Sequence, residues 1–222
     1  NNFPKGSMSN MMFDNLGNLV VAGFFDITTA APISKLYKSV DNGTNWTTMT
    51  DPVPNLAGFG KRIVALPTGE YIVTVNSYFD YYRSTDRGVT WTLVGNVGDV
   101  FSFAEWSGTT AYVLGGVRGL QKTTDGGLNF STINTGMPIN TSSDIAVLNN
   151  KDLLVGATSP YHSNDFGQSF QLATTQVAGS FLILGDSIIG YGSRLLQKSK
   201  DGGKTWTAFG TDRFFSFLTK DA

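Results

Sequence analysis

The chain has 222 residues, 16 of them basic and 17 acidic, and its formal net charge is −1. This balance excludes the basic field that holds a nucleic-acid backbone, and the absence of cysteine excludes disulfides and thiolate metal sites. The single histidine, His162, excludes a metal site built from several histidines. The sequence contains no run of 18 apolar residues, so no membrane-spanning helix is predicted.

Strand-like segments follow one another along the chain in five groups of four, separated by turn residues. Only 15% of the residues are charged and glycine is frequent, a mixture that favours β-structure with many turns. The predicted strands are 9–14, 18–25, 35–40 and 46–50; 61–67, 70–77, 81–85 and 90–95; 100–106, 111–117, 119–124 and 129–134; 144–150, 152–159, 160–164 and 169–174; and 180–185, 187–193, 194–199 and 205–210.

One eight-residue motif lies between the third and fourth strand of every group. Its copies are SVDNGTNW (39–46), STDRGVTW (84–91), TTDGGLNF (123–130), SNDFGQSF (163–170) and SKDGGKTW (199–206). All fit Ser/Thr-x-Asp-x-Gly-x-x-Trp/Phe, and the aspartates lie 45, 39, 40 and 36 residues apart. A period near 40 residues indicates a repeat architecture.

The residue types of the motif suit a hairpin turn better than a ligand site. The aspartate accepts backbone N–H groups within the turn, the glycine adopts a positive φ, and the aromatic ring packs between neighbouring sheets. A phosphate loop requires a lysine before Ser/Thr at a helix start, and a calcium loop requires several alternating carboxylates, so both readings are disfavoured. The structural residues are Asp41, Gly43, Trp46, Asp86, Gly88, Trp91, Asp125, Gly127, Phe130, Asp165, Gly167, Phe170, Asp201, Gly203 and Trp206.

These five motifs resemble the Asp-box, or BNR, repeat, and the resemblance covers essentially the whole chain. The family includes sialidases, xyloglucan-degrading enzymes, sortilin-type receptors and photosystem assembly factors, so it specifies a fold and not a function. It implies an all-β β-propeller of four-stranded antiparallel blades. We expect one propeller domain, 1–222, with blades at about 7–52, 58–96, 99–135, 142–175 and 178–210. Residues 211–222 form an extra strand that either opens a sixth blade of a longer chain or has a local role.

The resemblance also places ligand binding on the face opposite the boxes, where the loops between second and third strands lie. Aromatic rings beside charged side chains suit sugar recognition, because a ring stacks on a pyranose and charges bind its hydroxyls or carboxylates. Individually, these residues are also ordinary for strands and turns; His162 in particular reads as a solvent-facing turn residue. The candidate ligand-binding residues are Tyr78, Phe79, Asp80, Arg118, Tyr161, His162, Arg194 and Arg213.

A sialidase-like glycoside hydrolase is the enzymatic alternative. Resembling enzymes use three arginines, for which Arg118, Arg194 and Arg213 are the candidates here, and a Tyr–Glu nucleophile pair. The chain has only two glutamates: Glu70 on the box face, and Glu105 in a first strand that could line the channel. Loops are short for a catalytic cleft, and the Arg-Ile-Pro element of sialidases is absent.

We therefore expect a non-catalytic propeller outside the cell or on a virion or cell surface. Its partner is a glycan or a protein surface, and it needs no metal ion or cofactor. A purely structural module of a phage, virion or bacterial surface assembly is the remaining alternative.

Overall fold

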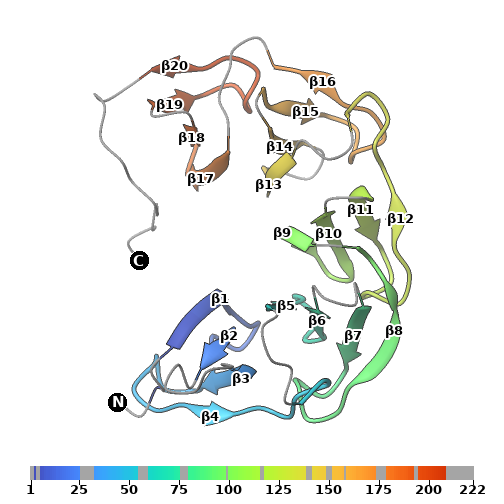
Figure 1. Ribbon diagram of the computed structural model, residues 1–222. Coiled ribbons are helices and arrows are strands. Elements are labelled where there is room, and N and C mark those ends of the chain that lie inside the picture. The colour runs from blue at the N-terminus through green and yellow to red at the C-terminus, as the bar shows by residue number, and fades with distance from the viewer. Residues whose placement is uncertain are drawn as a thin grey trace. The chain divides into compact units, whose positions relative to one another are not determined.

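The computed structural model describes residues 3, 6–25, 33–54, 60–75, 80–98, 100–115, 118–138, 142–148, 152–157, 159–173, 179–192 and 195–208. All regular structure in these ranges is β, and the strands form five sheets of four (Figure 1). None of the described segments is a helix long and apolar enough to cross a membrane. The predicted extra strand at 211–222 lies outside the described residues.

Each sheet contains four successive strands hydrogen-bonded in chain order. The predicted fold class, an all-β propeller of four-stranded antiparallel blades, is confirmed. The strands are β1 (Gly6–Phe13), β2 (Leu19–Phe25), β3 (Ile33–Ser39) and β4 (Thr47–Thr48); β5 (Lys61–Ala65), β6 (Tyr71–Val75), β7 (Asp80–Ser84) and β8 (Thr92–Asn96); β9 (Val100–Ser107), β10 (Thr110–Gly115), β11 (Gly119–Thr123) and β12 (Ser131–Thr132); β13 (Ser142–Val147), β14 (Leu153–Ala157), β15 (Tyr161–Ser163) and β16 (Gln171–Leu172); and β17 (Ser180–Leu184), β18 (Ser187–Gly192), β19 (Leu195–Ser199) and β20 (Thr207–Ala208).

The chain divides into two compact units, which are described separately. The first comprises Asn1–Val100, Ser107–Ala111 and Thr123–Phe130, and the second comprises Phe101–Trp106, Tyr112–Lys122 and Ser131–Ala222. The first unit therefore holds the first two sheets and the box of the third. The fourth and fifth sheets lie in the second unit.

Apolar side chains of neighbouring sheets form the core within each unit. In the first unit, Val20 and Leu36 of the first sheet pack in one cluster with Ile63 and Val73 of the second. The second strands are apolar on both faces, so β6 and β14 are buried along their whole length. Full burial of one such side chain contributes about 1.5–3 kcal/mol relative to exposure, which explains why these sheets pack face to face.

A buried lysine joins the first two sheets at the start of β5. The Lys61 side chain is fully buried, and its Nζ donates to both carboxylate oxygens of Asp51 at 2.8 Å. The same ammonium donates to the carbonyls of Ser34 (3.0 Å) and Val53 (2.7 Å). Burial lowers the Lys61 pKa, and the Asp51 carboxylate opposes that shift. The charge is retained because every donor of the ammonium has an acceptor.

Candidate functional site

The five boxes share one internal hydrogen-bond pattern. In the second box the Ser84 hydroxyl donates to Asp86 Oδ1 (2.7 Å) and accepts the Gly88 N–H (2.7 Å). Asp86 also accepts the backbone N–H of Thr90 (2.8 Å) and the Thr90 hydroxyl (2.6 Å). Equivalent bonds recur at Asp41, Asp125, Asp165 and Asp201. The carboxylates are thus engaged by their own turns.

These bonds also set the protonation state of the boxes. The Thr90 hydroxyl and backbone N–H, with Ser84, lower the Asp86 pKa to about 2. Bonds from Ser169 and Ser163, opposed by partial desolvation, lower the Asp165 pKa to about 2 as well. A permanently ionised, hydrogen-bonded carboxylate is a poor proton donor near neutral pH. Across the described residues, no cluster of three or more acidic or histidine side chains could hold a metal ion.

The backbone of each box turn requires two successive residues with positive φ. The expected positive φ is present at all five glycines, with values from 80° to 86°. The residue before each glycine is also left-handed, and in two boxes it is a large side chain, Arg87 (57°) or Phe166 (62°). The sequence motif does not indicate this second position, because it places no restriction on the residue type there.

Four of the five box rings reach across to a neighbouring sheet, as expected. Trp91 Nε1 donates to the Thr50 carbonyl (2.9 Å), and Trp206 belongs to a cluster that includes residues of the fourth sheet. The exception is Trp46, which corrects the expectation for the first box. Its ring packs against Phe3, with centroids 4.7 Å apart, and lies in a cluster with the same sheet's own side chains.

A basic side chain precedes each box aspartate by three residues, and in the second and third sheets it contacts the box of the next sheet. Arg83 Nε donates to the Gly126 carbonyl in the next box (2.6 Å), and Lys122 Nζ lies 3.5 Å from the Phe166 carbonyl in the box after that. Each accepting carbonyl belongs to the residue after the box aspartate. The equivalent residues are Lys38, His162 and Lys198. The sequence signal was present, but its partners lie more than 40 residues away.

Asp144 is the described carboxylate whose surroundings raise its pKa. Burial raises the pKa, while hydrogen bonds from the Ser102 hydroxyl (2.7 Å) and the Phe181 N–H (3.0 Å) oppose the shift. Asn10, at a similar β-bulge in β1, makes the same type of contact by accepting the Ile63 N–H (3.0 Å). A neutral amide at Asn10 makes this contact as well, so the contact does not require a charged carboxylate. We therefore assign Asp144 a structural role, in which it joins the first strands of neighbouring sheets.

The predicted ligand-binding residues are only partly described by the structure. Tyr78, Phe79, Arg194 and Arg213 lie outside the described residues, as does the side chain of Glu105. Asp80, Arg118 and Tyr161 are described and stand at the starts of the third strands β7, β11 and β15, with Arg118 directly before β11. The boxes follow the other ends of these strands, so the three side chains lie at the blade end opposite the boxes.

His162 departs from its expectation. It is not a solvent-facing turn residue but a buried residue of β15, with 7% of its surface exposed. Its Nε2 lies 3.8 Å from Asp152 Oδ1. Burial lowers the His162 pKa, with the Asp152 charge opposing the shift, so the imidazole is neutral near pH 7. The next residue, Ser163, is also buried, so both faces of β15 are covered at this point.

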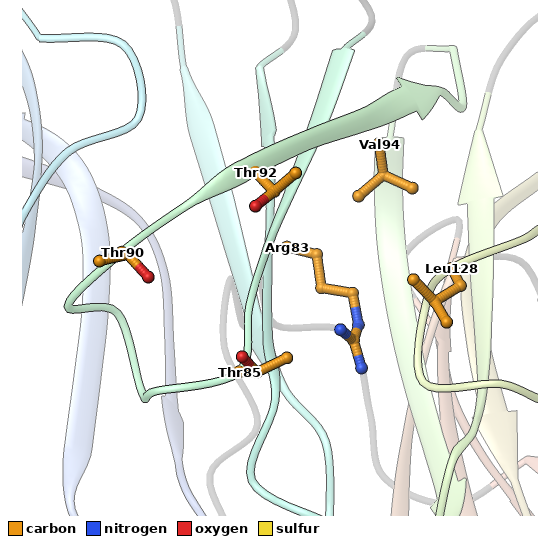
Figure 2. Close-up of a pocket in the computed structure, with 6 residues that line it drawn as sticks. All are labelled: Arg83, Thr85, Thr90, Thr92, Val94 and Leu128. Carbon is orange, nitrogen blue, oxygen red and sulfur yellow. The ribbon is translucent and has the colours of Figure 1, made fainter.

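The second sheet carries a surface hollow of about 190 Å³ beside its box (Figure 2). We name this the β8 hollow; its lining residues are Arg83, Thr85, Thr90, Thr92, Val94 and Leu128. Arg83 is held by Glu70, whose Oε1 lies 3.2 Å from its Nη2. The sequence gives no signal for this hollow, because Leu128 comes from the box of the third sheet.

Comparison with known proteins supports the fold. The family model described as BNR/Asp-box repeat matches residues 82–93, which include the whole second box. A search of curated protein sequences gave no match.

Several solved structures are similar to the chain. A GH74 enzyme from Niastella koreensis has a TM-score of 0.67 at 16% identity, covering 92% of this chain and 37% of its own. A GH74 xyloglucanase from Xanthomonas campestris has a TM-score of 0.66 at 16% identity, covering 86% and 36%. An ancestral GH74 enzyme has a TM-score of 0.68 at 15% identity, covering 94% and 32%.

The chain therefore spans about a third of the length of these enzymes, and at such identities the likeness concerns the fold alone. One copy of the motif matches the BNR/Asp-box repeat model, and five such copies lie on five four-stranded sheets, so the chain has a β-propeller fold with Asp-box-like repeats.

Proposed function

We propose that the chain is a non-catalytic glycan-binding propeller that acts outside the cell or on a particle surface. Recognition takes place at the blade ends opposite the Asp boxes. A protein partner at the same face is the competing outcome. The proposal rests on a difference between the two ends of the third strands. At the box end the carboxylates are hydrogen-bonded within their own turns, whereas polar side chains at the other end are partly or fully exposed.

The observation that carries the proposal is the saturation of the boxes. Each box carboxylate accepts several hydrogen bonds from its own turn, so the repeated motif leaves little capacity for a ligand. At the other end of the third strands, about 16 Å away for a five-residue strand, Arg118 is exposed and Asp80 and Tyr161 are half-buried. Within the second unit, Arg118 supplies a donor and Tyr161 supplies a ring, the chemistry that binds sugar hydroxyls and C–H faces.

A carbohydrate array followed by binding isotherms tests this function. Xyloglucan is the first polymer to try, because one structurally similar enzyme is named a xyloglucanase. Arg118→Ala should weaken binding about tenfold, as loss of one charge-assisted hydrogen bond does, whereas Lys200→Ala, an exposed residue of the last box, should not. Equal affinities for both variants, or no binding to any glycan, would contradict the proposal.

A glycoside hydrolase is the second candidate, favoured by the structural likeness to GH74 enzymes. Release of reducing ends from xyloglucan, or hydrolysis of a fluorogenic sialoside that is lost in Glu105→Gln, would establish it. If the chain neither binds nor hydrolyses any glycan, a structural role in a larger surface assembly becomes the better account.

A further inference from the structure

The fourth strand of the second sheet differs from the other fourth strands. β8 has five residues, whereas β4, β12, β16 and β20 have two each. Tyr81 pairs with Gly95 and Tyr82 with Leu93, so Val94 is an extra residue, a β-bulge. Bulges redirect a side chain and often lie next to functional sites. Here the bulge residue is Val94, which lines the β8 hollow (Figure 2).

The polar side of the β8 hollow offers both donors and acceptors. Arg83 uses its Nε for the Gly126 carbonyl and one Nη2 hydrogen for Glu70, which leaves three of its five N–H groups. In the first, third and fifth sheets the hydroxyl at the Thr92 position donates to a carbonyl of the adjacent strand. No such bond involves Thr92 within the described part of the chain, so this hydroxyl is available to a ligand.

The opposite side of the hollow is apolar and held in place. Val94 is half-buried, and Leu128 is 50% exposed. The Leu128 backbone is fixed at both ends, because its N–H donates to Asp125 Oδ1 (3.0 Å) and its carbonyl accepts the Tyr81 hydroxyl (3.3 Å). An apolar wall facing a few fixed polar groups is the usual composition of a small-molecule site.

We propose that the β8 hollow binds one neutral sugar ring. The ring lays its C–H face on Val94 and Leu128 and directs hydroxyls to Arg83 and Thr92. A volume of about 190 Å³ equals the space of roughly six water molecules, which suits one sugar ring. The ligand is neutral because the Arg83 charge is already balanced by Glu70 at 3.2 Å and a second carboxylate, Asp86, lies in the adjoining box.

The fifth sheet provides an internal comparison. The equivalent positions there, Lys198, Lys200, Thr205 and Thr207, line a hollow of about 260 Å³ together with Asp201. The repeat therefore produces a crease at this place in both sheets. Only in the second sheet does an extended, bulged fourth strand add an apolar wall among the described residues. This inference is independent of the proposed function, because the β8 hollow lies at the box end of the blade.

Nuclear magnetic resonance titration of the whole ¹⁵N-labelled chain with methyl glucoside, methyl xyloside and methyl galactoside tests the inference. At least one glycoside should produce saturable shifts of the Thr92, Val94 and Leu128 amides. Thr92→Val and Leu128→Ser should each weaken that binding about tenfold. Leu172→Ser, at a leucine of comparable exposure on β16 (58% against 50% for Leu128), is the matched control and should leave the affinity unchanged.

Three results would overturn the inference. One is the absence of saturable shifts with every neutral glycoside, and another is unchanged affinity in both variants. The third is a stronger response to glucuronate than to methyl glucoside. Shifts confined to Arg118 and Tyr161 would support the proposed function while rejecting a site in the β8 hollow, so the two ideas fail separately.

Discussion

Gly127→Ala tests whether the box glycine serves inter-sheet packing as well as the turn. Gly127 has a φ of +82°, and a Cβ added there would overlap Ile72 Cδ1 and lie 3.1 Å from Ile72 Cγ1. Ile72 belongs to β6 and is 1% exposed, so it has little room to move. Gly17 is the matched control, because its φ is +78° and nothing lies within 4 Å of an added Cβ.

The two substitutions share the backbone cost and differ in the packing cost. A left-handed conformation costs an alanine about 1–2 kcal/mol, which applies at both positions. Overpacking a tightly filled site adds about 1–3 kcal/mol, which applies only at Gly127. We therefore expect Gly127→Ala to destabilise the chain by about 2–5 kcal/mol and Gly17→Ala by about 1–2 kcal/mol.

A double-mutant cycle with Ile72→Val isolates the packing component. The single change Ile72→Val should cost about 0.5–1.5 kcal/mol, since it removes one buried methyl group. In the Gly127→Ala background the same change removes the overlapping carbon, so it should restore about 1–2 kcal/mol. Contacting residues show coupling of this size, whereas independent sites are additive.

Urea unfolding followed by tryptophan fluorescence and circular dichroism supplies the free energies of unfolding. The shift in midpoint at constant m value gives each difference. The reasoning is refuted if Gly127→Ala and Gly17→Ala cost the same, or if the cycle with Ile72→Val is additive within about 0.5 kcal/mol. Either result would show that the glycine is required for its φ alone.

Three further predictions concern buried or hydrogen-bonded charges. Lys61→Met should cost about 3–5 kcal/mol in urea unfolding because it leaves the Asp51 carboxylate without its buried partner, and a loss below 1 kcal/mol would contradict the contact. Stability should fall as the pH drops below about 6.5, because the lowered His162 pKa means that the unfolded chain binds the proton more readily. His162→Gln should flatten the curve between pH 7 and pH 5, and an unchanged slope there would rule out this histidine as the cause. Thr90→Val should raise the Asp86 pKa from about 2, measured by carbon-detected titration of the side chain, since it removes the hydroxyl that contributes most to the lowering; an unchanged value would show that the backbone bonds suffice.

The box and the blade plan could be predicted because their determinants are local. All the bonds that shape a box join residues no more than four positions apart, as between Ser84 and Gly88 or Asp86 and Thr90. Eight residues of sequence therefore contain the whole turn. The alternation and turn residues on either side then determine four strands per repeat.

Much of the candidate site could not be predicted in this way. The burial of His162 depends on the face of β15 that meets its neighbours, which the short PYHSN segment does not reveal. Arg83 is one of 16 basic residues in the sequence and received no role there, because its contact is with the Gly126 carbonyl 43 positions later. The sequence shows that a residue is charged, but the group that its side chain contacts depends on how the sheets pack.

By itself, then, the sequence determined the repeat, the hairpin at each box and the all-β class, because these depend on φ preferences and hydrogen bonds within a few residues. Only the tertiary structure decided which basic side chains join sheets and that β8 is extended and bulged. It alone brought Leu128 and Val94 together as the apolar side of a hollow that Thr92 also lines. These features depend on the register and separation of sheets, which arise from packing between segments that lie tens of residues apart.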